Sequence, residues 1–346
     1  MRYIISCIVL LACFALLQVS RYGMPSYFYR STSEIIPGLF LAQLTSESDL
    51  VVVGQVATFD EERRENVTEQ GQSFEVIHYV SKLNVSRLVK GKTNDSSIIV
   101  EFLSTPVRSY VIPNRGRIAL FFLRKVAEKR FRPVEPYYPF LAAISIPPKV
   151  ENTELDRAIG EIAQALEHPN VSEADKSTAI KALGSIDTVA SKQALHRISN
   201  GNNISLQIAA CAALFGLNDV SQMNIAEGLL LTPPKNVPIP MIQKLSSSLV
   251  RVKDPAAIPF LSKLISSGDL QTRRNASMAL RNTGDRQASS ALITALMDSD
   301  REVRYQGVMG LATITKHWEW APAYDVYSAN EQRYLTYWRE WAKINR

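Results

Sequence analysis

The C-terminal half of the chain repeats with a period of about 31 residues. Five leucines mark the period at spacings of 31, 35, 31 and 31 residues: Leu183, Leu214, Leu249, Leu280 and Leu311. A small residue stands one position before each leucine, and small residues let neighbouring helices pack closely. A fixed period of this length predicts an α-α superhelix, because each helix pair buries its apolar side only against the next pair.

The predicted helix starts follow the same register as the leucines. Eleven positions before the leucines stand Ser172, Asn203, Pro238, Asp269 and Asp300. Four of these side chains can accept a bond from the first helical turn, and the fixed φ of proline also suits a helix start. The turns after the leucines carry aspartates placed to start the next helices: Asp187, Asp219, Asp254 and Asp285. The register predicts helix pairs at 154–184, 189–217, 222–252, 256–283 and 287–315.

This pattern resembles the short HEAT-like repeats first associated with phycobiliprotein lyases, over roughly residues 154–315. Asp269 and Arg273 match the aspartate and arginine often seen in such repeats. Asp300 and Arg304 repeat the match, and each pair is spaced to bond across one helical turn. The repeat is a packing unit shared by many unrelated proteins, so the resemblance implies a solenoid at 149–316 without the lyase activity.

The last helix pair of a solenoid needs a cover for its apolar side. Residues 328–331 read as a capping box at the start of a helix. That helix carries aromatic residues along one side: Tyr334, Tyr337, Trp338 and Trp341. We expect residues 317–346 to form an aromatic C-terminal cap on the last repeat, with a ligand-binding aromatic patch as the alternative.

Between residues 46 and 148 the apolar pattern becomes that of β-strands. Strand-like runs occupy 50–56, 75–80, 82–85, 97–102 and 117–123. Several short strands without a long helix predict a small β-barrel or sandwich. We expect this domain and the solenoid to fold separately, with their boundary near Pro147 and Pro148.

Three segments of this region, 49–56, 89–91 and 119–123, resemble the netrin and metalloproteinase-inhibitor type of OB-like barrel in its exported bacterial form. The resemblance implies a small OB-like barrel at 46–148. Domains of that type usually carry disulfides, whereas this stretch has no cysteine. The departure excludes inhibition through an N-terminal cysteine clamped on a metal.

Residues 1–20 read as an export signal, because Arg2 precedes an apolar run that extends from Ile4 to Val19. The run is long for a signal-peptide core and short for a membrane span, so cleavage and retention as a membrane anchor both remain open. Residues 21–45 are predicted to form a linker with a short helix. We therefore expect an exported protein that is periplasmic, anchored outside the cytoplasm or secreted.

Most of the formal net charge of +6 belongs to the part before Glu151. Eight basic residues lie in one stretch, with Glu128 as its single acid: Arg108, Arg115, Arg117, Arg124, Lys125, Lys129, Arg130 and Arg132. Such a surface can bind anionic polymers or lipid headgroups, and the alternative is a solvated face. The second helices of the later repeats carry another basic set, a candidate protein-binding surface: Arg273, Arg274, Arg281, Arg301 and Arg304.

No catalytic, metal or cofactor motif is present, and the four histidines lack metal-ligand spacing. We expect His196 to be a partly buried structural residue and Cys211 to be a small buried one. We therefore predict a non-catalytic scaffold without cofactor or metal, which binds a protein partner at the cell envelope through the solenoid. The alternative is a module for acidic glycan, lipid headgroup or, less expected, nucleic acid on the basic OB-like domain.

Overall fold

The structure is a computed structural model of the chain, and it describes residues 40–69, 72–104, 112–148 and 153–345. The predicted export signal and most of the predicted linker lie outside the described residues. The one linker helix described, α2 (Leu41–Glu47), is short and buries Leu41 and Leu44. None of the helices in the described ranges is both long and apolar enough to span a membrane.

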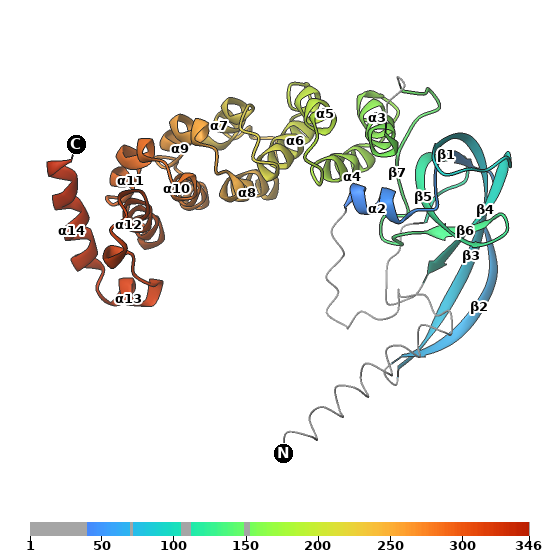
Figure 1. Ribbon diagram of the computed structural model, residues 1–346, viewed down its shortest axis with the longest axis horizontal. Coiled ribbons are helices and arrows are strands. Elements are labelled where there is room, and N and C mark those ends of the chain that lie inside the picture. Colours follow the sequence, from blue (N-terminus) through green and yellow to red (C-terminus); the bar gives the residue numbers. More distant parts are fainter. Residues whose placement is uncertain (1–39, 70–71, 105–111, 149–152, 346) are drawn as a thin grey trace, which may run out of the picture. The chain divides into compact units, whose positions relative to one another are not determined.

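Seven strands form one sheet in the described part of the N-terminal region (Figure 1). They are β1 (Leu50–Val56), β2 (Asp60–Glu69), β3 (Gln72–Lys90), β4 (Ser97–Ser104), β5 (Ile118–Ala127), β6 (Arg130–Pro133) and β7 (Phe140–Ala142). Five of them close a ring in the order β1-β3-β4-β6-β5, since β5 also pairs with β1. The pair β4–β6 is parallel and the other pairs of the ring are antiparallel. This near-barrel confirms the predicted small β-barrel.

The strands follow the apolar pattern of the sequence. In β4, buried and half-buried residues alternate, and β1 and β5 are almost wholly buried where they pair. Val52 of β1 faces Phe121 of β5 in that pairing, and both belong to the core of the ring. The predicted strands 75–80 and 82–85 are parts of one long strand, β3. The prediction missed β2, β6 and β7, of which β2 is strongly charged.

Ten helices of the described C-terminal region form five consecutive pairs (Figure 1). They are α3 (Glu154–Glu167) and α4 (Glu173–Leu183), α5 (Val189–Ser199) and α6 (Ile204–Gly216), α7 (Met223–Leu231) and α8 (Ile239–Ser248), α9 (Ile258–Leu264) and α10 (Leu270–Thr283), and α11 (Ser289–Ala295) and α12 (Arg301–Thr315). Short 3-10 turns adjoin three of them: η2 (Leu249–Arg251), η3 (Pro255–Ala257) and η4 (Arg286–Ala288). The predicted solenoid and its helix pairs are confirmed.

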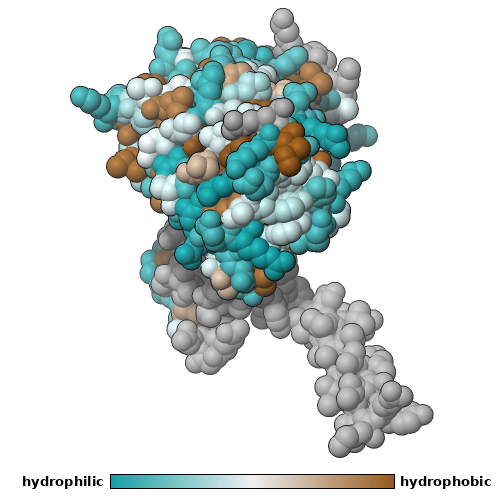
Figure 2. Space-filling view, turned by 90° about the vertical axis from the view of Figure 1, so that its left-hand side faces the viewer, coloured by the Kyte–Doolittle hydropathy of each residue, from teal (hydrophilic) through white to brown (hydrophobic). Residues whose placement is uncertain are grey.

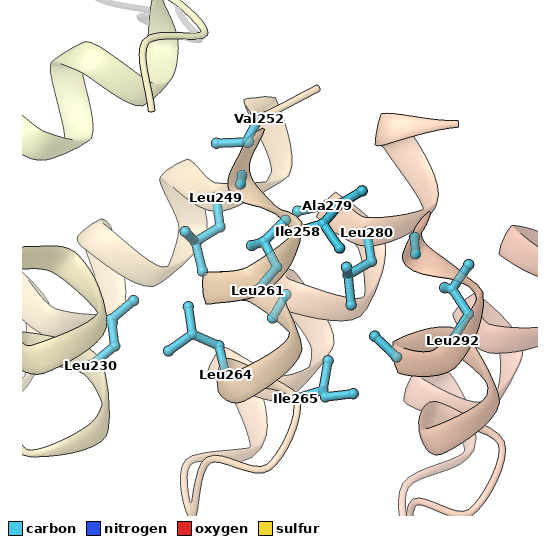
Figure 3. Close-up of a cluster of buried hydrophobic side chains, with 14 of the residues drawn as sticks. Leu230, Leu249, Val252, Ile258, Leu261, Leu264, Ile265, Ala279, Leu280 and Leu292 are labelled. Atoms are coloured by element: carbon cyan, nitrogen blue, oxygen red, sulfur yellow. The ribbon is translucent and has the colours of Figure 1, made fainter. Parts of the chain in front are cut away.

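The predicted register is visible in the helix starts and in the core. Ser172, Asn203, Asp269 and Asp300 each accept a bond from the backbone N–H three residues later, as N-caps do. The five leucines are fully buried: Leu183, Leu214, Leu249, Leu280 and Leu311. Side chains of successive helices point toward one another in this core, as Figure 3 shows for the middle repeats.

Two predicted cap residues and one predicted capping box are wrong. Asp254 and Asp285 do begin η3 and η4, each by accepting a backbone bond. Thr188 instead of Asp187 caps α5, and α7 begins after Gln222, beyond Asp219. The capping box expected at 328–331 does not form, because Ser328 lies inside the preceding helix and its hydroxyl makes no hydrogen bond, while the last helix begins only at Glu331.

The C-terminal segment covers the last repeat with η5 (Trp318–Trp320), α13 (Tyr324–Ala329) and α14 (Glu331–Ile344). Tyr327 and Trp338 are fully buried, and the rings of Trp320 and Tyr337 stack with centroids 3.7 Å apart. The surface seen from the α14 side is mainly hydrophilic, with hydrophobic residues in separate small patches (Figure 2). These contacts support the cap interpretation, although Trp318 remains 61% exposed.

The ring keeps a core of its own, and a second hydrophobic cluster joins it to the first helix pair. Leu120 of β5 and Ile159 of α3 both belong to this second cluster. Arg87 of β3 also forms an ion pair with Glu161 of α3, which is only 2% exposed, and donates to the carbonyl oxygen of Ile144 at 2.7 Å. The secondary structure changes near Pro147 as predicted, but the packing is continuous across that point.

Candidate functional site

A groove of about 340 Å³ lies across three neighbouring second helices of the solenoid. Its walls belong to α4 on one side and to α8 with η2 on the other, and its floor belongs to α6, which contacts both. The described lining consists of small, hydroxyl-bearing and cationic side chains with one isoleucine, and it includes neither a carboxylate nor an aromatic ring. This composition differs from that of the apolar core beneath it.

Helix α6 makes a floor without bulky side chains. It contributes Ala209, Ala212, Ala213 and Gly216, whose spacing puts them on one face of the helix. A Cβ added to Gly184 of α4 would lie 2.8 Å from the Cβ of Ala213, so the two helices are in close contact there. A Cβ added to Gly216 would lie 3.3 Å from Nη1 of Arg251. The bare backbone at Gly216 therefore leaves room for that guanidinium.

The wall formed by α8 and η2 carries polar residues at the same register positions. Lys244, Ser247, Ser248 and Arg251 stand five, two and one residues before Leu249 and two after it. The small residues of α6 stand at these same distances from Leu214. The repeat register thus places two cations and two hydroxyl groups beside a floor of small residues.

Three cations of the groove have no counter-charge among the described residues. Lys181 of α4, Lys244 and Arg251 are exposed, and no described carboxylate forms an ion pair with any of them. Partial desolvation in the groove lowers the pKa of the Lys244 ammonium, and the positive charge of Lys181 lowers it further. The groove is therefore a region of positive potential that an anionic group would neutralise.

The arginines expected to bind protein lie at contacts between successive repeats, and protein binding by them stays a prediction. Nε of Arg273 is 2.8 Å from a carboxylate oxygen of Asp298, and Arg274 donates two bonds of 2.9 and 2.7 Å to Asp300. Asp298 and Asp300 precede the second helix of the next repeat. The bond expected between Arg273 and Asp269 within one helical turn is thus replaced by a bond to the following repeat.

The remaining arginines of this set behave similarly. Arg281 donates to the amide oxygen of Gln306 at 3.1 Å. Arg304 donates to Glu331 of α14 at 2.7 Å, and Arg301 lies 3.5 Å from the same carboxylate. The bonds from Arg304 and the Tyr327 hydroxyl outweigh the effect of burial and lower the pKa of Glu331. These arginines therefore connect successive repeats with one another and the last repeat with the cap.

The basic stretch of the β domain is largely paired. Four of its cations lie against carboxylates from distant parts of the chain: Arg117 with Asp175, Arg124 with Glu47, Lys129 with Asp95, and Arg130 with both Glu62 and Glu101. The ratio of eight bases to one acid in the sequence is therefore not the ratio in space.

The other basic residues of the stretch differ in their surroundings. Arg115 and Lys125 are exposed, and Arg132 lies opposite Arg124 where β6 pairs with β5. Arg108 lies outside the described residues. Binding of an anionic ligand to this surface stays a prediction, and the paired cations reduce the charge available for it.

A second hollow, of about 500 Å³, lies between the β domain and α4. Arg117 and Asp175 stand on its wall and neutralise each other, and the guanidinium of Arg117 also lies 4.5 Å from the ring centre of Phe140. This hollow therefore lacks the uncompensated charge that distinguishes the groove.

His196 and Cys211, the two residues expected to be structural, lie in surroundings that agree with that expectation. His196 is partly buried, and its Nε2 lies 3.1 Å from Asp219, which also accepts the Ser221 hydroxyl at 2.6 Å. Burial raises the pKa of the Cys211 thiol to about 12. Within the described ranges, no group of three or more His, Cys, Asp or Glu side chains could hold a metal ion.

The sequence interpretation missed the groove cations, although a signal for them existed. Lys181 lies two repeats before Lys244, so a count of charges along the chain does not join them. The repeat register does connect these cations, because Lys244 and Arg251 stand at the positions that Ala209 and Gly216 occupy one repeat earlier. Reading those positions repeat by repeat would have brought the three cations together.

Comparison with known proteins agrees with the repeat architecture. The family described as HEAT repeats matches residues 227–312, from α7 to α12. A search of curated proteins finds no match. A phycocyanin lyase complex from Nostoc is similar at 17% identity, with a TM-score of 0.37, over 47% of this chain and 66% of that chain. The chain thus spans just under two thirds of that protein's length.

Two further solved structures show the same kind of likeness. Human deoxyhypusine hydroxylase is similar at 16% identity with a TM-score of 0.25, over 55% of this chain and 74% of that one. An engineered protein is similar at 14% identity with a TM-score of 0.33, over 56% and 66%. The class that the fold defines is an α-solenoid of HEAT-like repeats with an N-terminal β domain. HEAT repeats generally mediate binding between proteins.

Proposed function

We propose that this protein is a non-catalytic scaffold that binds a partner protein along the second helices of its solenoid, in the groove of α4, α6 and α8. The observation that carries the proposal is the groove itself. It combines a floor of small residues, which a partner backbone can approach closely, with unpaired cations and hydroxyl groups on its walls. Elsewhere, the arginines of the later second helices pair with carboxylates of the next repeat or of the cap.

The proposed setting of the scaffold rests on the sequence. The proposal includes export and action at the cell envelope, supported by the apolar run behind Arg2. It also includes an OB-type identity for the β domain, supported by the closed five-strand ring with its one parallel pair. In this view the β domain extends the first repeat, because the two share a hydrophobic cluster.

A peptide-display selection on the immobilised full chain tests the proposal. Ser247 is an exposed wall residue, so Ser247→Trp places a ring in the open groove, whereas Gln243→Trp adds the same ring to an exposed position of α8 that does not line the groove. We expect selected peptides to bind the wild type and Gln243→Trp alike, and to bind Ser247→Trp at least about tenfold more weakly. A selection that yields no peptide sensitive to Ser247→Trp would contradict the proposal.

A further inference from the structure

We infer that the groove of α4, α6 and α8 recognises an acidic segment of the partner, an extended stretch that carries aspartate or glutamate side chains. The inference rests on the proposed function and adds the chemistry of what is bound. Lys181, Lys244 and Arg251 stand on the two walls with no described carboxylate bonded to them. An acidic peptide supplies that missing counter-charge.

The groove has the dimensions of a peptide site. It crosses three helices, and neighbouring helix axes lie about 10 Å apart, so a ligand spans about 20 Å. An extended chain covers that length with about six residues. The cations stand on opposite walls, so carboxylates spaced along an extended chain can pair with each of them.

The floor and the hydroxyl groups of the groove also suit a peptide ligand. Ala209, Ala212 and Gly216 leave the floor without bulky side chains, so a peptide backbone can lie close to α6. Ser177 and Ser247 stand on the walls and can donate to carboxylate or carbonyl oxygens. The described lining has no aromatic ring for base stacking, which disfavours single-stranded nucleic acid.

Like-charge repulsion shows that the cations act on one another. The positive charge of Lys181 contributes to the lowered pKa of Lys244, although the two residues belong to different repeats. Bound carboxylates would relieve this repulsion. Because Lys181 faces Lys244 and Arg251 across the groove, the walls favour an acidic ligand over a neutral one of the same shape.

Fluorescence anisotropy with the full chain tests the inference. The probe is a labelled peptide of about eight residues that alternates glutamate and glycine, and glutamine replaces glutamate in its neutral counterpart. The groove variant combines three reversals: Lys181→Glu, Lys244→Glu and Arg251→Glu. The control variant reverses three exposed cations elsewhere: Lys92→Glu, Lys235→Glu and Arg286→Glu. Both variants change the net charge equally.

We expect the wild type to bind the glutamate peptide at least about tenfold more tightly than the glutamine peptide, with the preference falling as salt rises. The groove variant should lose that preference and the control variant should keep it. Equal binding of both peptides, or an equal loss in both variants, would overturn the inference. So would binding of a labelled oligonucleotide in place of the glutamate peptide.

The two proposals fail in different ways. If display selection yields neutral peptides that lose binding to Ser247→Trp, the groove binds protein but the acidic preference is wrong. If no selected peptide depends on the groove, the proposed function itself fails. The folded state of each variant is checked by its circular dichroism spectrum and its urea unfolding midpoint.

Discussion

The later repeats and the groove of the earlier repeats use cationic side chains in opposite ways. Arg273, Arg274 and Arg304 reach into the next repeat or the cap and pair with carboxylates there. Lys244 and Arg251 also lie on a second-helix segment, yet no described carboxylate pairs with them. The repeat is the same packing unit in both regions, and the acids of the following repeat decide whether a cation stabilises the stack or remains available.

The small residues of the second helices also differ between the two regions, in this case in their accessibility. Ala276 of α10 and Ala279 are fully buried beneath their neighbours. Ala213 of α6 stands at the same register position as Ala279, one residue before the leucine of its repeat, yet it lines the open groove. A small residue in one register thus serves close packing in one repeat and an accessible surface in another, so sequence position alone does not assign its role.

The largest effect is expected for the paired arginines. Arg273→Met should lower the free energy of unfolding by about 2–3 kcal/mol, because it leaves the carboxylate of Asp298 without its partner in a mostly buried position. The side chains of Arg273 and Asp298 are only 16% and 10% exposed. Urea unfolding followed by circular dichroism measures the change.

The control is the exposed pair of Arg197 and Glu167, whose side chains are both more than half exposed. Arg197→Met should cost less than about 1 kcal/mol, since solvent screens exposed ion pairs. Equal shifts for the two variants would mean that the pairing between later repeats stabilises no more than a surface contact.

A smaller effect is expected for the small residues. Ala276→Leu should destabilise the fold by about 1–3 kcal/mol, because the larger side chain overpacks a fully buried helix contact. Ser247→Leu, which adds a leucine to the exposed groove wall, should change stability by no more than about 0.5 kcal/mol. Thermal or urea midpoints compare the two. A similar loss in both would show that the groove wall is packed and inaccessible.

The solenoid could be predicted because its signals are local and repeated. Caps such as Asn203 and Asp300, and anchors such as Leu214, recur in one register, so each repeat supports the assignment of the others. The β ring could be predicted only in part. The strand β2 is rich in charge along its exposed length and pairs, among the described strands, only with β3, so its sequence does not look like a strand.

Charge partners were harder to predict than the fold. The acids that neutralise Arg117 and Arg130 come from α4, β2 and β4, and local sequence shows none of them. Ion pairing depends on which segments meet in space. Counting charges along the chain therefore overstated the basic surface of the β domain and overlooked the groove, whose cations are far apart in sequence.

The smallest effect concerns Lys244, and it tests whether the groove is truly without a counter-charge. Lys244→Gln removes an ammonium that burial and the charge of Lys181 disfavour, so it should raise the free energy of unfolding by a few tenths of a kcal/mol. The pKa of Lys244 is lower in the folded state than the ordinary 10.5, so the unfolded state binds more protons between the two values. Stability of the wild type should therefore rise slightly with pH through that window, and the variant should lack this rise. Urea unfolding near pH 8 and near pH 10 measures both, with Lys235→Gln as the control at an exposed position outside the groove. If Lys244→Gln instead weakens the fold, Lys244 has an anionic partner within the protein, and the contrast between the groove and the paired arginines of the later repeats disappears.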